Sequence, residues 1–235
     1  MADRDTDSKL DLILKRLDQL ERRQELYFEQ VEALLNLHTM LAPINAPLPP
    51  MRKWAIAPDF GNLLYTLLME YQPTQIVELG GGVSTVITGY YCAQMEIKAV
   101  VEAFDHHPLY ASLARQHIDS HQLIDVATVH HAPLEALEIS GEKWHWYDPT
   151  AFDLLTEIDF LTVDGPPQQD NPTSMVRYPA LPVLFSKLKS GAIILLDDAH
   201  REDEQKIVER WLDEFDLVKL REVDTEKGAV VLQKK

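Results

Sequence analysis

The sequence contains a single cysteine, Cys92, so the chain cannot form an internal disulfide bond. It also lacks any apolar run close to the ~20 residues that a membrane-spanning helix requires. The N-terminal stretch MADRDTDSKL does not have the apolar core of a signal peptide. From these absences we expect a protein of the reducing cytoplasm.

Basic residues are scarce as well. The chain has 22 Lys and Arg against 38 Asp and Glu, which gives a formal net charge of −16. Most of such a surface repels nucleic acids and anionic membranes, so we expect neither as the main partner. The 235 residues, 46% of them hydrophobic, leave room for one well-buried α/β domain and an appendage.

Residues 8–41 form a separate unit with a heptad pattern. The seam positions, spaced by three and four, are Leu10, Ile13, Leu17, Leu20, Gln24, Tyr27, Val31, Leu34, His38 and Leu41. So narrow an apolar stripe is poorly covered on a lone helix, so we predict a coiled coil that makes a homo-oligomer. The alternative is that the stripe packs back on the protein's own domain. On the seam, Gln24 and His38 would fix register, and a seam role for His38 is preferred to a metal ligand.

Residues 42–57 are rich in proline, which ends the helix and predicts an extended linker. Residues 58–235 then make up the second domain. We expect its first helix to begin at a cap formed by Asp59 and to bury one apolar face against a sheet.

The segment IVELGGGVST, residues 76–85, organises this second domain. Its apolar run is typical of a buried parallel strand, and Gly80, Gly81 and Gly82 permit a sharp turn. Ser84 or Thr85 then caps a helix whose free N–H groups face the same cleft as the Glu78 carboxylate. The pattern predicts a site for a small polar ligand.

The spacing within this segment is acidic-x-Gly-x-Gly, carried by Glu78, Gly80 and Gly82. It differs from the G-x-G-x-x-G dinucleotide fingerprint, because Thr85 stands at the third glycine position. Here the chain resembles the class I S-adenosylmethionine-dependent methyltransferases. The resemblance implies an α/β, Rossmann-like sheet with S-adenosylmethionine bound at this turn.

The following strands supply further cofactor candidates. We predict a second strand over 97–101 that ends at Glu102, where an acid accepts hydrogen bonds from ribose hydroxyls. Asp105 is the competing candidate, although it also suits the cap of the next helix. After the third strand, Ala132 would border the adenine. The last two strands, joined by DTEKG, predict the C-terminal antiparallel hairpin that this class of methyltransferases shares.

The segment EKWHWYDPTAF is expected to be a loop. Its residues Trp144, Trp146 and Tyr147 either line an acceptor pocket or simply pack under the loop, and packing is the more common case.

Three more acids follow the fourth and fifth predicted strands: Asp164, Asp197 and Asp198. The carboxyl ends of parallel strands share one edge of the sheet, so these acids should meet there. Crowded carboxylates repel one another, and a divalent ion would relieve that repulsion. The alternative is that Asp198 makes only loop hydrogen bonds.

The segments DGPP, RYPAL and LLDDAH resemble a bacterial group of class I methyltransferases that act on glycans and other small molecules. In the related metal-dependent O-methyltransferases, acids at the places of Asp164, Asp197 and Asp198 hold magnesium. The catechol type has a lysine where this chain has Pro167, so its base cannot be carried over. His200 could take the proton near neutral pH, or it could cap the following helix.

These patterns together predict an enzyme that moves a methyl group from S-adenosylmethionine to a hydroxyl of a small-molecule or glycan acceptor, with Asp164 and His200 as catalytic candidates. A non-catalytic coiled-coil adaptor on a methyltransferase-like scaffold is the first alternative. An NAD-linked oxidoreductase is the second, and Thr85 and the C-terminal hairpin disfavour it.

Overall fold

The computed structural model describes residues 2–95, 98–168 and 174–235, and in Ala2–Ser8, Lys9 and Asp11 only the backbone. A seven-stranded sheet forms its centre, in the order β3-β2-β1-β6-β7-β9-β8. The parallel strands are β1 (Gln75–Leu79), β2 (Val100–Asp105), β3 (Ala127–His131), β6 (Ile158–Val163) and β7 (Leu188–Asp197). The antiparallel strands β8 (Leu217–Val223) and β9 (Ala229–Lys234) complete it, so the predicted fold class and C-terminal hairpin are confirmed.

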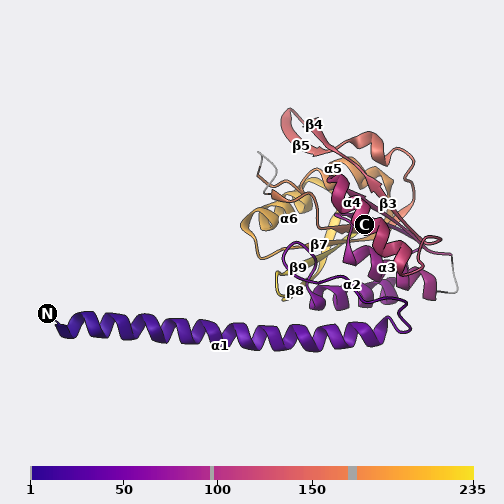
Figure 1. Ribbon diagram of the computed structural model, residues 1–235. Helices are drawn as coiled ribbons and strands as arrows, with labels where there is room; N and C mark the ends of the chain where they lie inside the picture. The colour runs from indigo at the N-terminus through magenta and orange to yellow at the C-terminus, as the bar shows by residue number, and fades with distance from the viewer. Residues whose placement is uncertain (1, 96–97, 169–173) are drawn as a thin grey trace.

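Helices cover both faces of the sheet (Figure 1). Helices α2 (Pro58–Tyr71), α3 (Val83–Gln94) and α4 (Pro108–Ser120) share one hydrophobic cluster with one face. Helices α5 (Ala180–Leu184) and α6 (Glu202–Glu214) share a second cluster with the other. Alternate strand residues feed the two clusters, as Ile193 and Ile194 do, because successive side chains point to opposite faces.

Helix α1 (Ala2–Met40) is separate along much of its length and extends beyond the domain in Figure 1. Its C-terminal part packs on the domain through the buried residues Ala33 and Leu37, and Leu41, directly after the helix, is buried as well. The Gln30 amide is hydrogen-bonded to Asp59, and Asn62 donates to the Ala33 carbonyl. The apolar seam residues before Ala33 are at least half exposed, from 50% for Leu17 to 64% for Tyr27. No described helix combines the length and apolar character needed to cross a bilayer.

Residues 42–57 follow the domain surface closely. Ile56 and Ala57 are buried, and Asn45 is hydrogen-bonded to the Tyr90 hydroxyl and the His121 carbonyl. The proline-rich segment therefore contributes a wall to the domain. Helix α2 begins at Pro58, one residue before the predicted cap, and Asp59 instead accepts hydrogen bonds within the first turn and from Glu226.

Two local predictions are wrong. The second strand runs to Asp105, three residues beyond the predicted end at Glu102, while Ile97 lies outside the described residues. The predicted aromatic loop is strand β5 (Glu142–Tyr147), which pairs with β4 (Leu134–Ile139) in a separate two-stranded sheet. A short 3₁₀ helix, Pro149–Phe152, follows β5, and a second, Phe185–Lys187, precedes β7.

Candidate active site

A cavity of about 480 Å³ lies at the carboxyl edge of the sheet, where the strand order reverses between β1 and β6. Ligands of open α/β sheets bind at this switch point, because the loops there diverge and leave a crevice. The cavity is lined by residues 49–56, by the turn after β1 with the start of α3, and by the end of β2 with helix α4. The last residue of β5, the loop after β6 with Arg177, the segment after β7 and the turn between β8 and β9 complete the lining.

The turn after β1 brings two loops into contact. Gly80 has φ +95°, and a Cβ there would lie 3.0 Å from the backbone nitrogen of Gly165. Only glycine allows both this conformation and this approach. A Cβ at Gly82 would meet no atom within 4 Å, because the backbone here faces the open cavity. The cavity-lining turn therefore lies directly beside the segment that carries Asp164.

Glu78 does not line this cavity. Its carboxylate is buried and accepts hydrogen bonds from the hydroxyls of Ser84, Thr85 and Thr88 on α3, at 3.0, 2.8 and 2.5 Å. Burial raises the pKa of the Glu78 carboxyl, and the three hydroxyls oppose that rise. Thr85 also accepts a hydrogen bond from the Gly82 N–H, so this acid and this hydroxyl tie the glycine turn to the helix.

The two acids of β2 have different positions. Asp105 ends the strand, lines the cavity and accepts a hydrogen bond from the His107 N–H. Glu102 lies in mid-strand opposite Val77 and contacts the His130 ring nitrogen, outside the cavity lining. Asp105 is thus the β2 acid that a ligand in the cavity can reach.

The remaining cofactor candidates also separate. Ser84 lines the cavity, whereas Thr85 and Ala132 are fully buried outside its lining. Of the three aromatic candidates, Tyr147 lines the cavity, and Trp144 and Trp146 belong to the second hydrophobic cluster. Two of the three therefore pack, and β5 presents only its last residue to the site.

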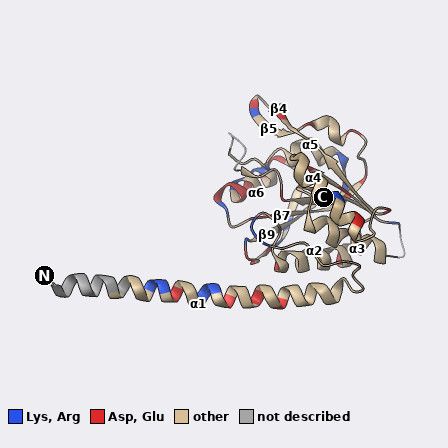
Figure 2. Cartoon of the chain, in the orientation of Figure 1, with Lys and Arg blue, Asp and Glu red and all other residues tan. Residues whose placement is uncertain are grey.

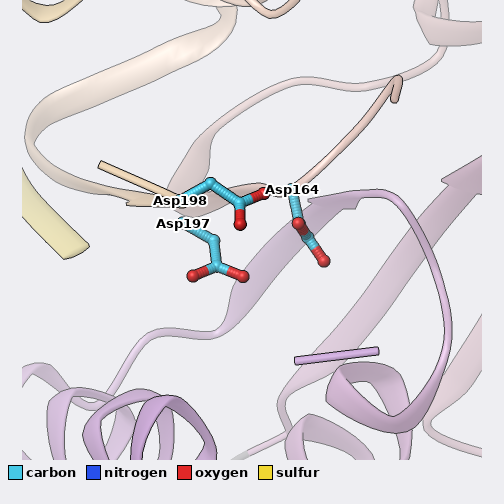
Figure 3. A group of neighbouring side chains, drawn as sticks. All are labelled: Asp164, Asp197 and Asp198. Atoms are coloured by element: carbon cyan, nitrogen blue, oxygen red, sulfur yellow. The ribbon is translucent and has the colours of Figure 1, made fainter. Parts of the chain in front are cut away.

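Asp164, Asp197 and Asp198 meet at the ends of β6 and β7 (Figure 3). One carboxylate oxygen from each lies within 4.8 Å of the others, a spacing that could hold a metal ion. Asp164 and Asp198 line the cavity, and Asp197 lies behind them at 1% exposure. Asp198 has a left-handed backbone, φ +62°, which is uncommon outside glycine, asparagine and aspartate.

Arg177 places a buried guanidinium in this acid cluster, a role that the sequence did not reveal. It donates to Asp198 Oδ2 at 2.6 Å, to Asp164 Oδ1 at 3.1 Å and to the Asp197 carbonyl at 2.8 Å. Burial alone would lower the pKa of Arg177, but the neighbouring carboxylates outweigh it and raise that pKa. The one signal in the sequence was that Arg177, the first residue of the RYPAL segment, lies between the two acidic motifs, 13 residues after Asp164.

The acid cluster is not fully satisfied by Arg177. Both carboxylate oxygens of Asp197 and Oδ1 of Asp198 are buried without a hydrogen-bond partner among the described residues. Burial and the charge of Asp198 raise the pKa of Asp197 to about 6. Burial, followed by repulsion from Asp197, raises the pKa of Asp164 well above its ordinary value. The cluster can therefore take up protons or a further cation.

His200 stands apart from this arrangement. Its side chain is 54% exposed, lies outside the cavity lining, and its Nε2 is 3.2 Å from Asp224 Oδ1. Its predicted role as a base finds no support in this geometry.

The wall formed by residues 49–56 holds residues that the sequence patterns did not single out. Lys53 and Trp54 line the cavity beside Lys227 from the turn between β8 and β9. The Lys227 Nζ donates to the carbonyls of Ala55 and Lys53, at 3.0 and 3.3 Å. A tryptophan with two basic neighbours inside a proline-rich segment was the available signal.

Comparisons with known proteins agree with this fold. The model of a family described as a methyltransferase domain matches residues 77–199. No curated protein sequence matches the chain. An O-methyltransferase from Bacillus cereus, solved in complex with SAH, is 15% identical with a TM-score of 0.60, and covers 87% of this chain and 91% of its own.

Two further solved structures share the fold. A SAH-bound methyltransferase from Podospora anserina is 14% identical, with a TM-score of 0.63 and coverage of 92% of this chain and 96% of its own. The O-methyltransferase TomG from Streptomyces achromogenes, in complex with SAM, is 12% identical, with a TM-score of 0.57 and coverage of 87% and 90%. The family match extends from within β1 to the residue after the Asp197 and Asp198 pair, and the chain belongs to this family of methyltransferase domains.

Proposed function

We propose that the protein transfers a methyl group from S-adenosylmethionine to a hydroxyl oxygen of a small-molecule or glycan acceptor. The observation that carries the proposal is the contact between the glycine turn and the loop of Asp164. Both line the same cavity at the switch point of the sheet. That contact puts a cofactor turn beside an acid that can accept a proton. Family membership and the SAM- or SAH-bound neighbours support the same cofactor.

The cofactor would occupy the half of the cavity along β1 and β2. Backbone groups of Gly80 and Gly82 approach it, together with Ser84 at the start of α3. The Asp105 carboxylate at the end of β2 would accept hydrogen bonds from the ribose hydroxyls. Glu78 and Thr85 would act indirectly by holding the turn. The positions of Glu102 and Ala132 outside the cavity lining favour no direct contact.

The reaction is an in-line displacement at the methyl carbon. The acceptor oxygen forms the new bond to the methyl group, the bond to sulfur breaks, and its electron pair stays on sulfur to give S-adenosylhomocysteine. The acceptor proton passes to the Asp164 carboxylate, because burial and repulsion from Asp197 raise the pKa of that group and make it a stronger base. Positioning of the two reactants supplies most of the acceleration in such a step.

A divalent ion fits the same cluster. The orphaned oxygens of Asp197 and Asp198 and the 4.8 Å grouping with Asp164 are what a hard cation needs. We propose that these three residues hold Mg²⁺, which when bound would lower the pKa of the acceptor hydroxyl. Thermal unfolding with and without Mg²⁺ tests this apart from activity: the wild type should be stabilised and Asp197→Ala should not.

Calorimetry with S-adenosylmethionine, S-adenosylhomocysteine and NAD tests the main proposal. Both sulfur compounds should bind, and Gly82→Val should weaken them by filling the open backbone face. Binding of NAD alone would contradict the proposal. Binding without turnover over a broad panel of hydroxyl acceptors would favour the adaptor function.

We also propose that α1 pairs with a second copy of itself. Its exposed seam positions Leu10, Ile13, Leu17 and Leu20 lie in the part of α1 that precedes the contact with the domain, whereas the last seam position, Leu41, is buried against the domain. Figure 2 shows that the basic residues of the described part of α1 lie before its middle, interleaved with acidic residues, and that only acidic residues follow, which favours an antiparallel pair.

Light scattering on the full chain tests this pairing. Leu17→Glu with Leu20→Glu should reduce the mass to that of a monomer without unfolding the domain, because both side chains are exposed in the single chain. A wild-type monomer, or a double variant with unchanged mass, would contradict it.

A further inference from the structure

The inference concerns the other half of the cavity and rests on the proposed function. If the cofactor occupies the half along β1 and β2, the acceptor occupies this second half. Its walls are residues 49–56, the ends of β6 and β7, and the turn between β8 and β9. Four cationic side chains line it: Lys53, Arg177, Arg201 and Lys227.

These four cations differ in how much of their charge is already used. Arg177 and Arg201 are paired with Asp198, at 2.6 and 2.9 Å. Lys227 donates to two backbone carbonyls, and its charge also acts on Asp164 and Asp197. Lys53 forms no ion pair among the described residues and is exposed. In a chain of net charge −16, an uncompensated cation on a cavity wall attracts an anion to that place.

The turn that carries Lys53 is held in a defined shape. Lys53 has φ +65°, a conformation that non-glycine residues adopt only where the surroundings impose it. The two hydrogen bonds from Lys227 fix the carbonyls on either side of Trp54. Glu226, next to Lys227, donates its N–H to Asp59 at 2.6 Å, which ties the same β8–β9 turn to the start of α2, just after the wall segment.

Trp54 follows directly and supplies an apolar surface. It is 62% exposed and lines the cavity. Such exposure is unfavourable, because burying an indole ring away from water lowers the free energy of the folded protein. An aromatic face beside an ammonium group suits a ligand that has both a ring and a negative charge.

We propose that the acceptor is an anionic ring compound, a hydroxyl-bearing ring with a carboxylate or a similar acidic group, whose ring lies on Trp54 and whose charge is bound by Lys53. Lys227 is a positioning residue that holds the turn. The acidic group selects the acceptor and the hydroxyl reacts near Asp164.

Trp54 also provides the measurement, because Trp144, Trp146 and Trp211 are buried and Trp54 is exposed. We would follow tryptophan fluorescence on the full chain during titration with 4-hydroxybenzoate and with its neutral isostere 4-hydroxybenzamide. The benzoate should bind about tenfold more tightly, equivalent to roughly 1.4 kcal/mol. Lys53→Met should abolish the preference. The matched control Arg52→Met removes an exposed neighbouring cation outside the cavity lining and should keep it.

Equal binding of the two compounds, or a preference that survives Lys53→Met, would overturn the inference. Absence of binding of either compound up to about 10 mM would also overturn it. Calorimetry with S-adenosylhomocysteine separates this from the proposed function. If that cofactor binds and the anion preference is missing, only the acceptor inference fails; if the preference is present without cofactor binding, the proposed function fails.

Discussion

Two groups of buried carboxylates lie near the same edge of the sheet, in opposite surroundings. Glu78, near the end of β1, accepts hydrogen bonds from three hydroxyls of the next helix and lies outside the lining of the cavity. Asp197 and Asp198, at the end of β7, keep buried oxygens that have no hydrogen-bond partner in the described part of the chain, beside the guanidinium of Arg177. An acid satisfied by neutral donors fixes a turn, whereas an acid with spare oxygens keeps its capacity for a proton, a metal or a substrate. Burial alone does not separate the two roles.

The largest effect is expected from removing the cation of the second group. Arg177→Met would leave several buried carboxylates uncompensated, at a cost of about 3–5 kcal/mol in the free energy of unfolding. The loss should be smaller at pH 5 than at pH 8, because the raised pKa of Asp197, about 6, lets it bind a proton at the lower pH. Urea unfolding at both pH values measures this.

Arg201→Met is the control, because Arg201 pairs with the same Asp198 but is 49% exposed. Its loss should stay below about 1 kcal/mol. Equal losses for both arginines would mean that Arg177 does not balance the cluster.

In the first group, Glu78→Ala should cost about 2–4 kcal/mol, because it leaves the hydroxyls of Ser84, Thr85 and Thr88 without their buried acceptor. Glu78→Gln keeps one oxygen acceptor and should cost less. At a temperature where the variants stay folded, the affinity for S-adenosylmethionine should be close to that of the wild type. A stable variant that cannot bind the cofactor would instead make Glu78 a direct contact.

Asp197→Asn, unlike Glu78→Ala, should raise the free energy of unfolding. The folded-state pKa of about 6 lies above the ordinary 3.8, so the folded protein holds this proton more tightly than the unfolded chain. Its contribution to stability therefore falls as the pH rises from about 4 to about 6 and stays low above that range. Without divalent ions, Asp197→Asn should be about 1–3 kcal/mol more stable than the wild type at pH 8, and no more stable at pH 4. A destabilised variant at pH 8 would contradict the unsatisfied state of Asp197.

The sequence predicted what depends on short patterns. An apolar run followed by three glycines specifies β1, its turn and the start of α3, and the acids directly after two apolar runs mark the ends of β6 and β7. Arg177 escaped because its partner Asp198 is 21 residues away, and nothing local to the RYPAL segment indicates which way the side chain points. Lys53 and Lys227 escaped for the same reason, since they meet only after two distant turns come together.

The acid of the second strand shows the limit most directly. Apolar residues flank Glu102 on both sides, in VVEAFD, so composition alone could not say where the strand ends. The end is set by pairing with β1, which aligns Leu79 with Phe104 and leaves Asp105 at the edge beside Gly80. Hydrogen bonding between strands, a non-local property, thus decides which acid faces the cavity.

We therefore expect substitution of Asp105 to have the smallest effect on stability. It should nevertheless have a clear effect on the binding of S-adenosylmethionine. Asp105→Asn keeps the oxygen that accepts from the His107 N–H but loses one of the two acceptors available to ribose hydroxyls. The unfolding free energy should change by less than about 1 kcal/mol, and the affinity for S-adenosylmethionine should fall about tenfold in calorimetry. Glu102→Gln is the matched control and should leave that affinity unchanged, since its carboxylate contacts His130 outside the cavity lining. If Glu102→Gln weakens binding and Asp105→Asn does not, the ribose contact belongs to Glu102. The comparison of buried acids would then need a third kind of carboxylate, one in mid-strand that reaches the ligand only after the cavity changes shape.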